Sequence, residues 1–425
     1  MAILSRTLGL LALSSAISLA HAELLIQVSK AGDDARPIAI VPFANDRPGE
    51  SLAEIIKSDL AQTGLFRPVS DLPGQPVSLA DIRYPDWSAA RIDPIVVGQV
   101  TAQTPGLFGI QYDLASATQQ KRLSGETLNN IAPARWRDAA HYISDRIFEQ
   151  LTGKPGAFRS HIAYVLQYSA GGATRYRLEV SDADGQRPQT VLDSPEPILS
   201  PAWSPDGKKI AYVSFESRRP AVVVQNLATQ QREVLSRAKG LNGAPSWSPD
   251  GTRLALTLSQ DGNPEIYVLN VADKSLTRMT NHYAIDTEAR WMPDGKALIF
   301  TSDRGGSPQI YRLDIDSRDV TRLTFDGNFN ARGSVSPDGR WLAMVHRERG
   351  QTFQIAIQDL QSGALSTLTS TPLDESPSFS PNSQMLVYAT RQDGRGVLGI
   401  MSLDGRFKIK LPATDGQVRE PAWSP

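Results

Sequence analysis

The chain of 425 residues contains no cysteine. That absence excludes disulfides, thiolate metal ligands and a cysteine nucleophile. An excess of one charge sign is also missing, because 44 Lys and Arg stand against 45 Asp and Glu. Nucleic acids and anionic membranes attract a clustered basic surplus, so neither is an expected partner. The chain must be stable through its cores alone, and its length is sufficient for two or three domains.

Long apolar runs are missing after residue 22. Within residues 1–22, Arg6 is the only charged side chain, and an apolar stretch from Leu8 to Leu19 leads into Ala20-His21-Ala22. This pattern predicts a secretory signal peptide that is cleaved before Glu23. The stretch is shorter than the roughly 20 residues that span a bilayer, which disfavours a retained membrane anchor. We therefore expect an exported protein that does not span a membrane.

Motifs for catalysis and metal binding are missing as well. The sequence has no Gly-x-Ser-x-Gly elbow, no Walker loop and no Gly-x-Gly-x-x-Gly turn. Four histidines follow the signal peptide, and none has a neighbour at metal-ligand spacing: His141, His161, His282 and His346. Asp182-Ala-Asp184-Gly185 resembles the start of a calcium loop, but Asp193 replaces the Glu needed at the twelfth position, so a hairpin turn is predicted. We expect no catalytic residue, no metal site and no cofactor, although calcium in a central channel stays open.

A repeat of 44 residues dominates the second part of the chain. Trp203-Ser-Pro-Asp-Gly207 returns with variations, and its proline stands at 205, 249, 293, 337, 381 and 425. Proline presets φ for a turn and glycine supplies the left-handed position, so the motif predicts a turn between two strands. Because it recurs in nearly every repeat, packing and turn formation explain it better than ligand binding.

Each repeat contains segments for four short strands, which is typical of a β-propeller blade. Six blades account for residues 162–425, after a linker at 153–161. No Trp-Ser-Pro motif precedes Ile162, whereas an extra copy, Glu420–Ser424, ends the chain. We therefore predict a six-bladed propeller in which the C-terminal strand becomes the innermost strand of the first blade.

Residues 23–152 lack the repeat and predict a small α/β domain. Buried strands are expected at Pro37–Val41 and Asp93–Val100, and an exposed-edge strand at Leu107–Ala115. Ser51 is expected to cap one helix, and Pro133 to open a last helix that stops at Gly153.

The first residues after the signal peptide, Glu23–Ser29, form an apolar extended run. Two interpretations remain open for this segment. It is either an edge strand of the α/β sheet or a mobile segment that adds as a strand to a partner's sheet.

The loops that precede the innermost strands crowd around one mouth of a propeller channel. Unlike the turn motif, these loops differ from blade to blade, which is typical of a surface that recognises one specific partner. The alternative is that their charges are ordinary solvated loop residues. The candidate binding residues, which give an acidic rim interrupted by arginines, are Asn242, Ala244, Asp286, Thr287, Glu288, Asn330, Arg332, Asp374, Glu375, Arg419 and Glu420.

The whole chain resembles the TolB family of the Tol-Pal system. The resemblance rests on the signal peptide, the α/β domain, Gly156–Val165, Ser200–Gly207 and the closing stretch Asp404–Pro425. It implies a non-enzymatic adaptor in the Gram-negative periplasm that supports outer-membrane invagination and integrity during cell division.

The resemblance also implies partners. The lipoprotein Pal would bind at the propeller mouth, and some colicins or phage proteins would exploit the same system. The inner-membrane protein TolA would bind the N-terminal segment, which here is Glu23, Leu24, Leu25, Ile26, Gln27 and Val28.

Two other function classes remain as alternatives. A propeller-type hydrolase or lyase needs a separate catalytic domain, and no region of the chain is left over to form one. A cell-wall glycan binder needs aromatic platforms, and the mouth has few aromatics beyond Tyr283 and Phe329.

Overall fold

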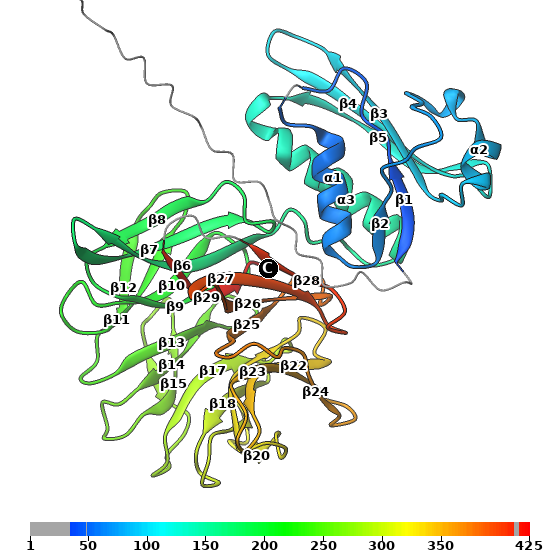
Figure 1. The fold of residues 1–425 in the computed structure, drawn as a ribbon. Helices are drawn as coiled ribbons and strands as arrows, with labels where there is room; N and C mark the ends of the chain where they lie inside the picture. The colour runs from blue at the N-terminus through cyan, green and yellow to red at the C-terminus, as the bar shows by residue number, and fades with distance from the viewer. Residues whose placement is uncertain (1–34, 48, 412–415) are drawn as a thin grey trace, which may run out of the picture.

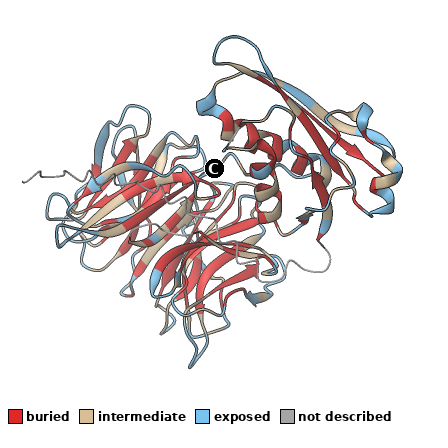
Figure 2. Ribbon diagram, turned by 45° about the horizontal axis from the view of Figure 1, so that its top comes forward, coloured by how far each residue is buried: buried red, intermediate tan, exposed pale blue. Residues whose placement is uncertain are grey.

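The computed structural model describes residues 35–47, 49–411 and 416–425, which form a small α/β domain and a six-bladed β-propeller (Figure 1). This confirms the fold class expected from the sequence. Each part has its own buried interior (Figure 2). The predicted signal peptide and the segment Glu23–Val28 lie outside the described residues.

The α/β domain is built on a five-stranded sheet with the order β2-β1-β3-β4-β5. Its strands are β1 (Arg36–Ile40), β2 (Phe66–Pro68), β3 (Ile95–Ala102), β4 (Phe108–Ser116) and β5 (Lys121–Ile131). The prediction of an exposed edge strand at 107–115 is wrong. Strand β4 pairs with β3 on one side and β5 on the other, and seven of its nine residues are buried.

Helices cover both faces of this sheet: α1 (Leu52–Gln62) and α3 (Trp136–Thr152) on one, α2 (Tyr84–Ala89) on the other. Alternation along β1 explains the two layers, because Ile38 and Ile40 pack under α1 and α3 while Ala39 faces Trp87 of α2. As expected, the Ser51 hydroxyl caps α1 by accepting from Glu54 N at 3.4 Å. Gly153 ends α3 with φ of 72°. Short 3₁₀ turns lie at Leu79–Asp81 and Pro133–Arg135.

Each propeller blade is a four-stranded antiparallel sheet. From innermost to outermost strand, the blades are: blade 1, β29 (Gln417–Trp423), β6 (His161–Ala170), β7 (Ala173–Asp182), β8 (Gln189–Ser194); blade 2, β9 (Ile198–Trp203), β10 (Lys209–Ser214), β11 (Ala221–Asn226), β12 (Arg232–Ser236); blade 3, β13 (Asn242–Trp247), β14 (Arg253–Leu258), β15 (Glu265–Asn270), β16 (Leu276–Arg278); blade 4, β17 (Asp286–Trp291), β18 (Ala297–Ser302), β19 (Gln309–Asp314), β20 (Val320–Arg322); blade 5, β21 (Phe329–Val335), β22 (Trp341–Arg347), β23 (Gln354–Asp359), β24 (Leu365–Thr367); blade 6, β25 (Glu375–Phe379), β26 (Met385–Gln392), β27 (Arg395–Ser402), β28 (Lys408–Leu411).

The C-terminal strand closes the ring, as the repeat predicts. Strand β29 pairs antiparallel with β6, with Trp423 opposite Ile162. The indole N–H of Trp423 donates to Ser160 Oγ at 2.7 Å, and the ring is buried in the core shared by blades 1 and 6. The first and last parts of the propeller sequence are thereby joined in one sheet.

The Ser-Pro-Asp-Gly motif acts as a turn. In blade 2, the Ser204 hydroxyl donates to Asp206 at 2.6 Å and accepts from Lys209 N at 2.9 Å. Gly207 takes φ of 68°. The same arrangement recurs around Ser248 and Ser336, so the motif's polar groups are satisfied within the turn.

The propeller has two distinct faces. The innermost strands begin at one face, here named the mouth face, and end at the other, here named the turn face, where the Ser-Pro-Asp-Gly turns lie. The α/β domain and linker contact the turn face, since Asn382 Nδ2 donates to Pro155 O and Lys154 Nζ donates to Gln384 Oε1, both at 3.0 Å. Gly64 also approaches Phe407 so closely that an added Cβ would lie 2.5 Å from the Phe407 Cβ. The mouth face is therefore left free of the α/β domain.

Candidate functional site

A β-bulge in every innermost strand shapes the channel. In each blade one residue takes a left-handed conformation, with φ between 44° and 57°, where the pairing register shifts. These six residues stand 44 positions apart and line the channel, whose cavity holds about 320 Å³: Ser200, Ala244, Glu288, Arg332, Ser376 and Glu420. Four of the candidate residues thus belong to one structural ring.

Arg332 gathers acidic side chains from three other blades. Its Nε lies 3.2 Å from Glu288 Oε1, and its Nη1 lies 3.7 Å from Glu375 Oε2. Its Nη2 lies 3.8 Å from Glu420 Oε1, and Nη1 also donates to Ser376 Oγ at 2.6 Å. The acidic residues expected on the mouth are therefore held as a cluster around one arginine, named here the Arg332 cluster.

The electrostatics of the Arg332 cluster follow from its burial. Burial opposes the charge on Arg332, but the three glutamates outweigh that effect and raise the pKa of its guanidinium. Burial also raises the pKa of Glu420, with Arg332 acting against the increase. The cluster is stable only as a set, because removing the arginine would leave three carboxylates close together.

Four candidate residues are buried instead of exposed, which corrects the expected acidic rim. Asn242, Asp286, Asn330 and Asp374 occupy one register position of their blades, and each is at most 1% exposed. Asp286 accepts from Arg304 at 2.7 Å, and Asp374 accepts from Thr371 and Thr390 at 2.7 and 2.6 Å. These side chains hold the mouth loops in place and do not present themselves to a partner.

Asn330 shows how such a residue pins its loop. Its amide nitrogen donates to Gln309 Oε1 at 2.8 Å and Asp326 O at 2.7 Å, while its oxygen lies 2.8 Å from His346 Nδ1. We expect Asn330→Ala to lower the free energy of unfolding by about 1–3 kcal/mol, because these buried partners lose their hydrogen bonds. Urea denaturation measures this. The exposed neighbour change Asn328→Ala should be nearly neutral, and equal effects would contradict the assignment.

Three other candidates lie on the innermost strands of blades 1, 3 and 4. Thr287 lies with its hydroxyl 3.4 Å from that of Thr257 in the adjacent blade, and Ala244 lines the channel. Arg419 is exposed on β29.

Apolar exposure on the mouth face is the feature that the sequence interpretation missed. Ten large apolar side chains are exposed in the described part of the chain, and six of them lie on this face: Leu199, Leu241, Tyr283, Ile285, Phe325 and Leu373. Tyr283 is 86% exposed and Phe325 is 72% exposed. The 44-residue repeat could have indicated this feature. An apolar residue directly precedes the buried residue of the mouth loop in four blades: Leu241, Ile285, Phe329 and Leu373. Exposed apolar side chains that share one face are a common feature of interaction surfaces.

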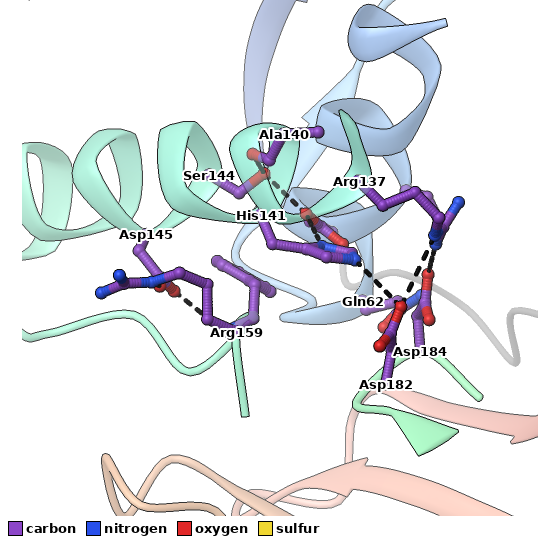
Figure 3. Close-up of polar contacts among 12 residues, drawn as sticks. Gln62, Arg137, Ala140, His141, Ser144, Asp145, Arg159, Asp182 and Asp184 are labelled. Atoms are coloured by element: carbon purple, nitrogen blue, oxygen red, sulfur yellow. Dashed lines mark hydrogen bonds and ion pairs between the residues drawn. The ribbon is translucent and has the colours of Figure 1, made fainter. Parts of the chain in front are cut away.

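A second group of functional side chains joins the two domains (Figure 3). His141 on α3 lies with Nδ1 2.8 Å from Asp59 on α1 and Nε2 3.8 Å from Asp182 in blade 1. Arg137 pairs with Asp184, and Arg187 pairs with Asp182 at 2.8 Å and Asp138 at 2.5 Å. Asp182–Gly185 forms the hairpin turn expected from the sequence, and it serves as the docking point for α3.

The interdomain group contains side-chain types that could hold a metal ion. Within the described residues, Asp59, His141 and Asp184 each place a ligand atom within 4.8 Å of the others. However, Arg137 already pairs with Asp184, and His141 already pairs with Asp59. These candidate ligands are thus already engaged in ion pairs, and we describe the group as a salt-bridge network.

A cavity of about 430 Å³ lies beside this network, between the domains. Its walls include Leu65 and Phe148 from the α/β domain, and Met385 and Trp423 from the propeller. Strand β1 begins next to this cavity, because Arg36 N donates to Leu65 O at 2.9 Å.

None of the described helices is long and apolar enough to cross a membrane. A closed propeller with an α/β domain docked on its turn face places the chain among six-bladed β-propeller proteins with an accessory domain. The family model described as the TolB beta propeller domain matches residues 148–425, and that of the TolB amino-terminal domain matches residues 24–123. The chain belongs to the TolB family.

Proteins with similar sequences or structures align with this chain over nearly its whole length. The Tol-Pal system protein TolB of Acinetobacter baylyi is 61% identical over 96% of this chain and 95% of its own. The protein of the same name from Pseudomonas putida is 58% identical over 94% of each chain. The crystal structure of TolB from Acinetobacter baumannii superimposes with a TM-score of 0.89 at 53% identity, covering 95% of this chain and 100% of that one. The chain is thus a non-enzymatic component of the Tol-Pal system.

Proposed function

We propose that the protein is a periplasmic adaptor that binds Pal through the mouth face and TolA through the segment Glu23–Val28. In this role it supports outer-membrane invagination and integrity during cell division, and colicins or phage proteins exploit the same surfaces. It needs no cofactor for this role. The observation that carries the proposal is the exposed apolar side chains gathered on the face that the α/β domain leaves free.

The mouth face has the composition of a protein interface. Exposed Tyr283 and Phe325 supply aromatic anchors, and the Arg332 cluster supplies a polar centre that is already hydrogen-bonded. The four buried loop residues hold the mouth loops in one conformation before a partner binds, which lowers the entropic cost of binding. A glycan binder is less favoured, because the two exposed aromatics lie in different loops, after β16 and after β20, and do not form one stacking platform.

The test replaces the two aromatic anchors. Tyr283→Ala with Phe325→Ala should weaken binding of the soluble domain of Pal by about 30-fold or more, because truncating a central aromatic typically costs about 2 kcal/mol or more. Isothermal titration calorimetry on the mature protein measures the dissociation constant. The exposed positions of both residues leave the core intact, so the melting temperature should stay within about 2 °C.

A matched control keeps the chemistry but changes the location. Val234→Ala and Leu276→Ala remove exposed apolar side chains from the outer edge strands β12 and β16, away from the mouth. They should leave Pal affinity unchanged. Full affinity in the mouth variant, or an equal loss in the edge variant, would remove the mouth from the proposal.

A further inference from the structure

The register of the innermost strands sets one residue apart inside the channel. Two positions after each bulge, five blades carry alanine or serine, whereas blade 4 carries Arg290; the six residues are Ala202, Ser246, Arg290, Ser334, Ser378 and Ala422. All six line the channel. The guanidinium of Arg290 therefore projects from a ring of otherwise small side chains.

Arg290 has no acidic partner among the described residues. Its recorded polar contact is from Nη1 to the carbonyl oxygen of Pro245 at 3.4 Å, and no carboxylate lies within 4.0 Å. A guanidinium carries five N–H donors, so most of its donor capacity is unused. The residue is partly buried in the channel; burial lowers the pKa of Arg290, and the charges of Glu288 and Glu420 act against that decrease. An anion that joins this partly buried guanidinium would form charge-assisted hydrogen bonds with its unused donors.

The nearest glutamates are already engaged. Glu288 pairs with Arg332 through Oε1 and accepts from Thr301 Oγ1 through Oε2 at 3.1 Å. Glu420 pairs with Arg332 through Oε1 and accepts from Ser200 N through Oε2. The Arg332 cluster thus satisfies its own carboxylates and leaves Arg290 free to bind another one.

We propose that Arg290 forms an anion site in the channel that takes a small carboxylate. A planar carboxylate matches the guanidinium fork with two parallel hydrogen bonds, and the small neighbours leave space for it. This inference goes beyond the adaptor function, because it does not depend on Pal being the partner. The carboxylate comes either from a free small acid or from an acidic side chain that a peptide presents down the channel.

Trifluoroacetate tests the site as a carboxylate probe. Fluorine NMR of trifluoroacetate titrated with the mature protein should show saturable binding, and Arg290→Gln should weaken it by about tenfold or more. Arg290→Lys keeps the charge without the fork, so its affinity should lie between the two. Arg349→Gln, an exposed change on the loop after β22, should bind like the unmodified protein. Melting curves of each variant verify that it is folded.

Two capped peptides then distinguish the source of the carboxylate. Acetyl-Gly-Glu-Gly-amide that displaces trifluoroacetate, where the glutamine analogue does not, would support delivery by a peptide side chain. Displacement by acetate but by neither peptide would support a site for free small acids. Absence of saturable trifluoroacetate binding, or folded Arg290→Gln that binds trifluoroacetate as tightly as the unmodified protein, would overturn the proposal.

Discussion

A chain truncated after Gly416 is expected to lose the propeller as a cooperatively folded unit. The truncation removes β29, which supplies the innermost strand of blade 1 and contacts blades 1, 2 and 6. Without it, one edge of β6 is unpaired and the core around Ile162 opens to solvent. At 37 °C the truncated chain should lack the near-ultraviolet circular dichroism signal of a packed propeller. On heating, calorimetry should show a cooperative unfolding transition of the propeller for the intact chain and none for the truncated one.

Point substitutions in β29 show whether the loss of stability comes from the packing of this strand and not from shortening the chain. Trp423→Ala should lower the free energy of unfolding by about 3–5 kcal/mol, because it leaves a cavity and removes the bond to Ser160. Arg419→Ala, an exposed change in the same strand, should stay within about 0.5 kcal/mol. A truncated chain that melts like the intact one would show that the ring does not depend on the closing strand.

The second large effect is expected at the salt-bridge network between the domains. Asp182 is shared by His141, Arg137 and Arg187, and its side chain is only 7% exposed. Asp182→Asn removes the charge that these cations face, so it should lower the free energy of unfolding by about 3–5 kcal/mol near pH 6. Urea denaturation measures that change. Faster proteolysis at residues 153–160 would report release of the α/β domain.

The pH dependence of this network has a definite sign. Burial opposes protonation of His141, but Asp59, Asp182 and Asp184 outweigh it and raise its pKa to about 10. Its contribution is fully present below the unfolded pKa of about 6.5 and is lost as the pH rises through 10. Burial raises the pKa of Asp182, but His141 and Arg187 outweigh it and lower the pKa to about 2. That contribution is present above about pH 4 and is lost as the pH falls through 2.

Stability of the unmodified protein should therefore decline between pH 7 and pH 10, and Asp182→Asn should flatten this decline. Asp71→Asn, an exposed change in the α/β domain, provides the matched control and should preserve the profile. Burial raises the pKa of Asp59, which offsets part of the gain from His141. An Asp182→Asn profile parallel to that of the unmodified protein would show that the network does not titrate as a unit.

The blade number and the closing strand could be predicted because the motif recurs every 44 residues, so that the copies can be counted and the extra copy at the C-terminus identified. The direction in which side chains point on the mouth face could not be predicted from the sequence. The bulge at Glu288 interrupts the alternation of the strand, and Asp286 is buried although its side chain is charged. The sequence also does not show whether a carboxylate such as Asp286 accepts a hydrogen bond from a nearby arginine, as it does here from Arg304.

Two further features were hidden for different reasons. Strand β5 has a polar sequence with few apolar residues, so periodicity did not reveal it, and β4 was misread as an edge in consequence. His141 meets Asp59 when α1 and α3 pack together, and it meets Asp182 only after the two domains have packed. Contacts between residues so distant in sequence leave no local pattern, and the docking role of the Asp182–Gly185 turn was invisible for that reason.

Hydrogen exchange with and without the soluble domain of Pal tests the adaptor account most directly. Pal is expected to protect the backbone amides of the mouth loops, above all residues 279–285 and 323–328, and to leave the Ser-Pro-Asp-Gly turns of the other face unchanged. Protection confined to the turn face or to the α/β domain, or no protection at saturating Pal, would contradict it.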